Sequence, residues 1–366
     1  MIHTSAPGKL FLLGEYAVLE GAPALLTAVD RRVRVRIEES DSDRWLLDAP
    51  GLGIHNLSLQ PDGALPPALD RSTREKLRLF DAVRRAVAES GAAVSTAAPR
   101  ALSISIDSSE LSLGGYKLGL GSSAAVAVAL TAGLAHVRSL NFDKGALFEV
   151  AVAAHRQAQD GVGSGADVAA AVNGGLISYS RGATVTQAAS LAALAWPEDL
   201  TMMVVVTGTG SSTPELVGRV SEYAKRNDAG YRADLARLTA LAQRATAALG
   251  SADTFLTLTS EYFEALETLD AHAGAGIISD RHRELHALAA QSGGVFKSSG
   301  AGGGDVGLAF ARRGAPARDL AAALLAAQAH IVPLAFCAAG INTDADFDSV
   351  RGTADIDSMR GTMDFL

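Results

Sequence analysis

The chain has 366 residues, a formal net charge of -8 and one cysteine. The length exceeds one typical domain, so we expect two lobes, each with its own core. The acidic balance and the lack of any Lys/Arg block argue against a nucleic-acid partner. Cys337 alone excludes an internal disulfide and a cysteine-rich metal site, which is typical of a cytoplasmic protein. The longest apolar stretch, Ala124 to Val137, is too short to span a bilayer and no signal peptide is evident, so no membrane partner is expected.

The first predicted elements are a strand, a second strand and a helix. Pro7-Gly8 opens a short apolar strand that carries Lys9 and ends at Gly14. A lysine in such a strand more often reaches water than a ligand. Residues Arg32 to Ile37 alternate between arginines and apolar side chains, which predicts a half-exposed strand. Ser72-Thr-Arg-Glu75 is a capping box that predicts the start of an amphipathic helix ending near Gly91.

A strand at Leu102–Ile106 precedes the stretch Lys117-Leu-Gly-Leu-Gly-Ser-Ser-Ala-Ala125, which is a candidate phosphate cradle. Gly119 and Gly121 have no Cβ, so their backbone N–H groups can approach an anion. The helix predicted from Ser122 adds unpaired N–H groups and a positive dipole end. Ordinary Gly-rich turns capped by serine have the same composition, so this stretch alone does not decide its function.

Two other phosphate-binding motifs do not fit the chain. No G-x-x-x-x-G-K-[ST] sequence is present. Gly119, Gly121 and Ala124 match the loose G-x-G-x-x-A dinucleotide fingerprint, but that fingerprint follows a buried strand, and here Gly114-Gly-Tyr-Lys117 precedes it. A Rossmann site is therefore not expected.

The rest of the chain predicts a second loop–helix junction and a second α/β lobe. A helix from Lys144 to about Gln159 leads into Asp160-Gly-Val-Gly-Ser-Gly-Ala-Asp167. A strand at 176–179 closes the first lobe, and the Ala-rich stretch 188–196 is the boundary candidate. The second lobe is predicted to contain a strand at 202–206, helices across most of 214–291, a strand–glycine loop–strand over 295–310, a helix at 316–329 and a strand at 331–336.

Three separated segments resemble the signature motifs of the GHMP small-molecule kinases. They are Pro7-Gly-Lys9 through Gly14-Glu15, Gly119-Leu-Gly-Ser-Ser-Ala-Ala125 and Ser298-Ser-Gly-Ala-Gly-Gly-Gly304. The resemblance implies a two-lobed α+β fold. Its N-terminal lobe, residues 1–194, would be like ribosomal protein S5 domain 2, and its C-terminal lobe, residues 195–344, would be a ferredoxin-like α/β unit. Residues 345–366 are expected to form a weakly ordered acidic tail.

Within the family, the sequence most resembles the phosphomevalonate kinases. Tyr16 stands where mevalonate kinases usually carry histidine, Lys297 directly precedes the third motif, and Gly210-Ser-Ser-Thr-Pro214 is similar to a turn of that subgroup. The implied reaction is transfer of the ATP γ-phosphoryl group to (R)-5-phosphomevalonate in the mevalonate pathway of isoprenoid biosynthesis. A mevalonate kinase, another GHMP kinase and a catalytically silent nucleotide-binding member are the alternatives.

The resemblance also implies site residues and ligands. Lys9 and Asp167 would be the catalytic pair, although Asp167 alone is also typical of a first-turn helix carboxylate. The ATP-binding residues would be Lys117, Gly119, Leu120, Gly121, Ser122, Ser123 and Ala124. The acceptor-binding residues would be Tyr16, Ser164, Ser212, Lys297, Ser299 and Gly300.

Ser123 is the expected Mg²⁺ ligand, and ATP and Mg²⁺ are the expected cofactors. The segment His155-Arg-Gln-Ala-Gln-Asp160 offers no Glu to match the second metal ligand of mevalonate kinases. Lys117 and Lys297 are candidates for binding the extra phosphate, and each could instead be a solvated surface charge. The expected partners are small molecules, with the chain acting as a monomer or homodimer.

Overall fold

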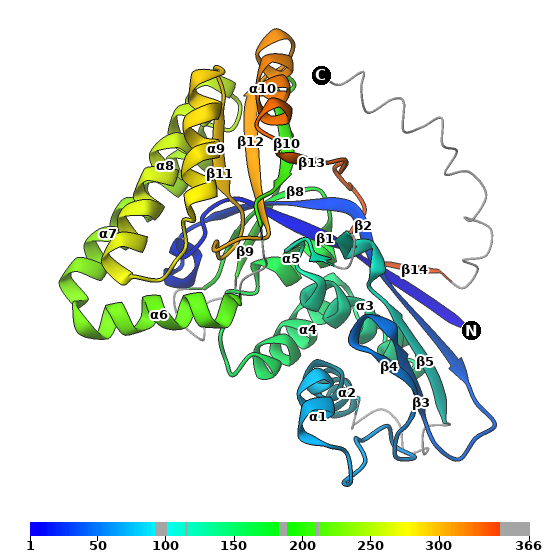
Figure 1. Cartoon of the computed structure of the whole chain (residues 1–366). Helices are drawn as coiled ribbons and strands as arrows, with labels where there is room; N and C mark the ends of the chain where they lie inside the picture. Colours follow the sequence, from blue (N-terminus) through cyan, green and yellow to red (C-terminus); the bar gives the residue numbers. More distant parts are fainter. Residues whose placement is uncertain (92–100, 114–115, 183–188, 209–211, 345–366) are drawn as a thin grey trace.

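The computed structural model describes residues 1–91, 101–113, 116–182, 189–208 and 212–344, without the side chains of 113, 116, 117 and 344. The predicted acidic tail, 345–366, lies outside these residues. The chain forms two lobes, each built on its own sheet with helices packed against it (Figure 1). The two-lobed α+β architecture expected from the sequence is confirmed.

The N-terminal lobe is built on an eight-stranded sheet whose main path runs β14-β1-β2-β5-β3-β4, with β8 joining β2 to β9. Its strands are β1 (Ile2–Leu13), β2 (Ala24–Glu39), β3 (Leu46–Ala49), β4 (Ile54–Ser58), β5 (Leu102–Asp107), β8 (Leu176–Ser180), β9 (Ser190–Leu194) and β14 (Asn342–Asp344). Val33, Val35 and Ile37 on β2 are buried, as their alternation predicts.

The α-helices of this lobe, within the described residues, are α1 (Arg71–Lys76), α2 (Arg78–Ser90), α3 (Ser122–Val137), α4 (Lys144–Ala158) and α5 (Ala166–Asn173). Helix α3 is apolar all round because it lies against β1 and β2 on one side and α2, α4 and α5 on the other (Figure 1). The prediction of a capping box that begins at Ser72 is wrong. Asp70 is the N-cap instead, because its carboxylate accepts a hydrogen bond of 3.0 Å from the Thr73 amide. The short remaining elements are η1 (Ala17–Glu20), η2 (Pro50–Leu52), η3 (Ser109–Leu111), β6 (Ser112–Leu113) and β7 (Tyr116–Lys117).

The C-terminal lobe is built on a four-stranded antiparallel sheet in the order β11-β12-β10-β13. These strands are β10 (Leu200–Val206), β11 (Val295–Ser298), β12 (Val306–Arg312) and β13 (His330–Val332). The helices are α6 (Thr213–Arg226), α7 (Asp228–Ala247), α8 (Ala252–Ala273), α9 (Asp280–Gln291) and α10 (Ala315–Ala326). Helices α8 and α9 contact β11, whereas α7 reaches across to η1 and β2 of the other lobe. Within the described residues, none of the helices combines the length and apolarity needed to cross a bilayer.

After β13 the chain returns to the first lobe as a strap, residues 333–344, which ends in β14 paired with β1. The Arg32 guanidinium donates to the carbonyls of Gly340 at 2.6 Å and Ser5 at 2.8 Å. A Cβ on Gly340 would lie 2.1 Å from the carbonyl oxygen of Val172, and a Cβ on Gly174 would lie 2.3 Å from the Gly340 nitrogen. The strap is therefore packed tightly against the C-terminal end of α5. The division of the lobes at residue 194 remains a prediction.

Truncation should separate the strap from the tail. Removing residues 345–366 should leave the melting temperature unchanged, because β14 and the Arg32 contacts are retained. Removing residues 337–366 should lower it by several degrees or prevent folding, since about 2 to 4 °C is lost per kcal/mol in domains of roughly 150 to 250 residues. Thermal unfolding followed by circular dichroism measures both, and full-length Gly340→Ala should reproduce part of the second loss. Equal melting temperatures for the two truncated chains would refute the role given to the strap.

Candidate active site

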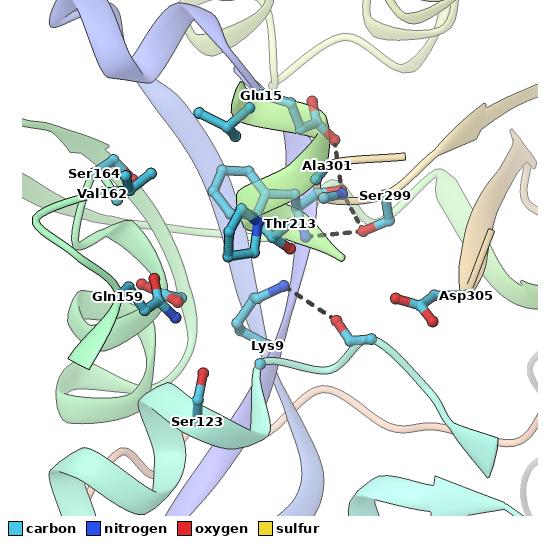
Figure 2. Close-up of a pocket in the computed structure, with 18 of the residues that line it drawn as sticks. Lys9, Glu15, Ser123, Gln159, Val162, Ser164, Thr213, Ser299, Ala301 and Asp305 are labelled. Carbon is cyan, nitrogen blue, oxygen red and sulfur yellow. Dashed lines mark hydrogen bonds between the residues drawn. The ribbon is translucent and has the colours of Figure 1, made fainter. Parts of the chain in front are cut away.

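The candidate site is a cavity of about 530 Å³ between the lobes, lined by Leu111 of η3 and by five longer segments of the chain (Figure 2). They are the β1–η1 segment (Lys9, Glu15, Tyr16), the first glycine loop (Gly119, Leu120, Gly121, Ser122, Ser123), the α4–α5 turn (His155, Gln159, Val162, Gly163, Ser164, Asp167), the start of α6 (Thr213, Pro214, Val217) and the second glycine loop (Ser299, Gly300, Ala301, Gly302, Asp305). The three motifs recognised in the sequence thus meet at one cavity.

The first glycine loop has the backbone of an anion cradle. Gly121 is the N-cap of α3 in the left-handed conformation, with φ 73°, and has no side chain to satisfy the first N–H groups of the helix. The Lys9 amide donates to the Leu120 carbonyl at 2.8 Å, which fixes the loop to β1. Ala124 is fully buried and is not among the lining residues. The side chain of Lys117 lies outside the described part of the chain, so its predicted role stays a prediction.

Lys9 lies between the two glycine loops (Figure 2). Its Nζ donates to the Gly119 carbonyl at 3.2 Å and lies 5.2 Å from the centre of the Phe11 ring. Burial lowers the pKa of the Lys9 ammonium, while the charges of Asp167, Glu15 and Asp305 act in the opposite direction. The alternative in which Lys9 reaches bulk water is wrong, because only 7% of the residue is exposed.

Substitution of Gly121 should disturb Lys9 as well as the nucleotide. A Cβ at Gly121 would lie 2.8 Å from Lys9 Cε, so Gly121→Val should both obstruct the cradle and displace the ammonium. We expect weaker binding of AMPPNP by calorimetry and a loss of kcat at saturating ATP, in a protein that remains folded. Gly175→Val is the matched control, because Gly175 has a similar φ of 65° and nothing within 4 Å of its Cβ position. If both variants bind AMPPNP as the wild type does, the cradle lies elsewhere.

Asp167 is held at the start of α5 by a clamped turn. Its Oδ1 accepts a hydrogen bond of 3.0 Å from the Val168 amide, as a first-turn carboxylate can. The Arg156 guanidinium donates to the carbonyls of Gly163 at 3.2 Å and Ser164 at 2.8 Å. The Ser164 carbonyl also accepts from the Tyr179 hydroxyl at 2.9 Å. The sequence did not predict this role for Arg156, which follows His155 in the segment that lacks a Glu for the second metal ligand.

Ser123 lies beside a buried histidine. Its Oγ is 3.0 Å from His155 Nε2, and the same ring nitrogen is 3.1 Å from the Gln159 side-chain amide. In the part of the chain that the structure describes, no three His, Cys, Asp or Glu side chains are grouped as a metal site would need. One hydroxyl at the cavity wall is nevertheless compatible with Mg²⁺, because this ion is commonly held by one or two protein oxygens together with substrate phosphates and water.

Of the residues predicted to contact the acceptor, two are hydrogen-bonded to other parts of the chain and one lies outside the cavity lining. The Tyr16 hydroxyl donates to the Ala301 carbonyl at 2.6 Å, and Ser299 Oγ donates to the Phe11 carbonyl at 3.0 Å, although both residues line the cavity. Ser212 is exposed at the N-cap of α6 and is not among the lining residues, whereas Thr213 is. Ser164 and Gly300 line the cavity, and their contact with the acceptor stays a prediction.

Lys297 requires a correction. Its side chain is fully buried, does not line the cavity, and pairs with Glu15 at 2.5 Å. The alternative of a solvated surface charge is wrong, and direct contact with a bound phosphate is not supported. The glycine-rich sequence after Lys297 suggested a phosphate contact, but nothing local showed that its partner would be a carboxylate 282 residues away.

The second glycine loop is supported by two acidic residues that sequence reasoning also missed. Asp305 lines the cavity opposite Gly119, and a Cβ on Gly119 would lie 2.8 Å from the Asp305 carboxylate. Asp270 accepts hydrogen bonds of 2.6 to 2.9 Å from the amides of Gly276, Ile277 and Ile278. The Ile277 carbonyl in turn accepts from the Gly303 amide at 2.8 Å, so Asp270 anchors the loop from behind.

Comparison with known proteins places this architecture in a family. Residues 82–175 match the GHMP kinases N terminal domain family. The chain is 34% identical over 337 residues to a phosphomevalonate kinase from Streptomyces sp. (strain CL190), covering 83% of this chain and 88% of that protein. The chain belongs to the GHMP kinase family. Its predicted resemblance to the phosphomevalonate kinases is thereby confirmed.

Two further comparisons bear on the subgroup and the fold. A mevalonate kinase from Methanothermobacter thermautotrophicus is also 34% identical, but over only 47% of this chain and 48% of that protein. The structure of Streptococcus pneumoniae phosphomevalonate kinase in complex with phosphomevalonate and AMPPNP superposes with a TM-score of 0.75, covering 92% of this chain and 100% of that one at 21% identity. At this identity the superposition supports the shared fold alone.

Proposed function

We propose that this chain transfers the γ-phosphoryl group of ATP to (R)-5-phosphomevalonate, giving 5-diphosphomevalonate and ADP in the mevalonate pathway. The observation that carries phosphoryl transfer is the buried Lys9 between the anion cradle and the second glycine loop. The choice of acceptor rests on similarity over most of the chain to a phosphomevalonate kinase, whereas the similarity to the mevalonate kinase covers about half.

Among the described residues, Lys9 is the one lysine that lines the cavity, and the carboxylates of Glu15, Asp167 and Asp305 line it as well. Both reactants carry phosphate charge, so in-line attack requires a cation between them, and Lys9 is positioned by its bond to Gly119 to supply it. The acceptor phosphate is already largely ionised near neutral pH, so it does not depend on a general base. Asp167 then acts on Lys9 by favouring and orienting its charged form.

The nucleotide would bind with its phosphates at the first glycine loop and α3. The unpaired N–H groups of the first turn and the hydroxyls of Ser122 and Ser123 would contact phosphate oxygens. Mg²⁺ would be held by Ser123 and the phosphates, and it supplies charge neutralisation of the transferring group. Ser164, Thr213 and Gly300 would contact the acceptor from the opposite walls.

The assignments that remain are parts of the same proposal. We propose a cytoplasmic location, in keeping with the single Cys337. The lobes would divide at residue 194, between β9 of the larger sheet and β10 of the smaller sheet, with β14 returning to the larger sheet after β13.

Phosphorus NMR of the reaction tests the proposal. With ATP and Mg²⁺, the single resonance of phosphomevalonate should be replaced by two coupled diphosphate resonances as ADP accumulates. Failure to consume phosphomevalonate, or release of inorganic phosphate in place of a diphosphate product, would refute the proposed reaction.

A further inference from the structure

The most deeply buried ion pair among the described residues joins the two lobes. Lys297, on β11 of the C-terminal lobe, pairs with Glu15, which follows β1 of the N-terminal lobe. Their side chains are 0% and 2% exposed. Burying two charges is costly, and a pair of this kind often adds little net stability compared with apolar residues of similar volume. The pair therefore calls for an explanation beyond stability.

Both members of the pair also hold the second glycine loop. Glu15 Oε1 accepts a hydrogen bond of 3.3 Å from the Gly300 amide, and Lys297 Nζ donates to the Ser298 carbonyl. The Glu15 carbonyl accepts from the Tyr262 hydroxyl at 2.7 Å, which attaches this turn to α8. The pair thus fixes the first residues of the loop relative to β1.

The loop held in this way lies directly against Lys9. A Cβ on Gly300 would lie 4.0 Å from Lys9 Nζ, so a shift of the loop by a few tenths of an ångström would change the surroundings of the ammonium. Two neighbouring hydrogen bonds also hold the loop against the N-terminal lobe. Ser299 Oγ accepts from the Phe11 amide at 3.1 Å, and the Tyr16 hydroxyl donates to the Ala301 carbonyl. Both of these bonds cross between the lobes.

We propose that Glu15 and Lys297 are positioning residues, whose buried ion pair sets the second glycine loop over Lys9 in the geometry that the acceptor requires. The inference deepens the proposed function and rests on it for its kinetic consequence. Lys297 does not line the cavity, whereas Glu15 does, and the charge of Glu15 also raises the pKa of Lys9 directly. The positioning effect is transmitted by the backbone of Ser299 to Ala301, so hydrogen exchange in this loop reports it separately from the charge effect on Lys9.

A neutral double variant separates positioning from stability. Glu15→Gln/Lys297→Met keeps the approximate shape of both side chains and removes both charges, so its melting temperature should stay close to that of the wild type. Amide hydrogen exchange in residues 298–304 should nevertheless rise about tenfold or more, because Lys297 no longer tethers the loop. The value of kcat/KM for phosphomevalonate should fall on the order of tenfold, while AMPPNP affinity is retained.

Leu238→Ala is the control. Leu238 is fully buried on α7, so its truncation should lower the melting temperature without changing exchange in residues 298–304 or kcat/KM. If the double variant does not fold, Glu15→Gln alone is measured in the same way, since it removes one charge and retains an acceptor for the Gly300 amide.

The inference would be overturned if the double variant is stable and residues 298–304 exchange at the wild-type rate. It would also be overturned if the loss in kcat/KM only follows the loss in melting temperature across the variants. The exchange measurement needs no substrate. If the wild-type protein fails to phosphorylate phosphomevalonate, only the proposed function is lost. The exchange measurement then still decides whether the ion pair positions the loop.

Discussion

Lys9→Met is expected to lower kcat on the order of a hundredfold or more, because removal of one preorganised electrostatic contact to the transition state commonly costs that much. In the proposed mechanism the ammonium offsets repulsion between two phosphates, and the proposed ATP cradle is mostly backbone. The affinity for AMPPNP should therefore change little. Steady-state kinetics and calorimetry on the same preparation measure the two quantities.

The pH dependence gives a second measure of Lys9. Burial lowers the pKa of its ammonium, so the charge is present at low pH and is lost at a lower pH than for an exposed lysine. Turnover should accordingly fall on the alkaline side, and Lys9→Arg should lack that limb because arginine stays protonated. Lys144→Met, at an exposed position that begins α4, is the control. Wild-type turnover in Lys9→Met would remove Lys9 from the mechanism.

Asp167→Asn should also be strongly damaging, and its effect should overlap with that of Lys9→Met. The Asp167 charge raises the pKa of Lys9, so its removal should move the alkaline limb to lower pH. Residues that act as a unit show non-additive losses, and the double variant should be little worse than Lys9→Met alone. An independent general base would instead contribute its full loss. A double variant whose loss in kcat equals the product of the two single losses would contradict this mechanism.

The local parts of the site could be predicted from sequence. Gly119 and Gly121 are needed wherever a backbone adopts positive φ close to an anion, and the structure gives them φ 63° and 73°. The alternation in β2 and the periodicity of α4 follow from burial on one face, which neighbouring residues alone reveal. These signals depend on residues a few positions apart.

The contacts between distant segments could not be predicted in the same way. The position of Lys297 directly before the third motif makes it a candidate for a phosphate contact or a surface charge, yet its partner is Glu15 of the other lobe. Asp270 and Arg156 satisfy backbone groups of turns, and nothing in the sequence of either turn indicates which side chain does so. The strap was also hidden, since nothing in residues 333–344 indicates that they pack on α5. Identifying such partners requires the fold.

Side-by-side measurement of ADP release with 5-phosphomevalonate and with mevalonate tests the central claim most directly. At equal ATP and Mg²⁺, kcat/KM should be far higher for 5-phosphomevalonate, and turnover of mevalonate should be close to the background without acceptor. Equal or greater turnover of mevalonate would contradict the assignment and favour a mevalonate kinase. If ADP is released with neither 5-phosphomevalonate nor mevalonate, both kinase assignments are excluded.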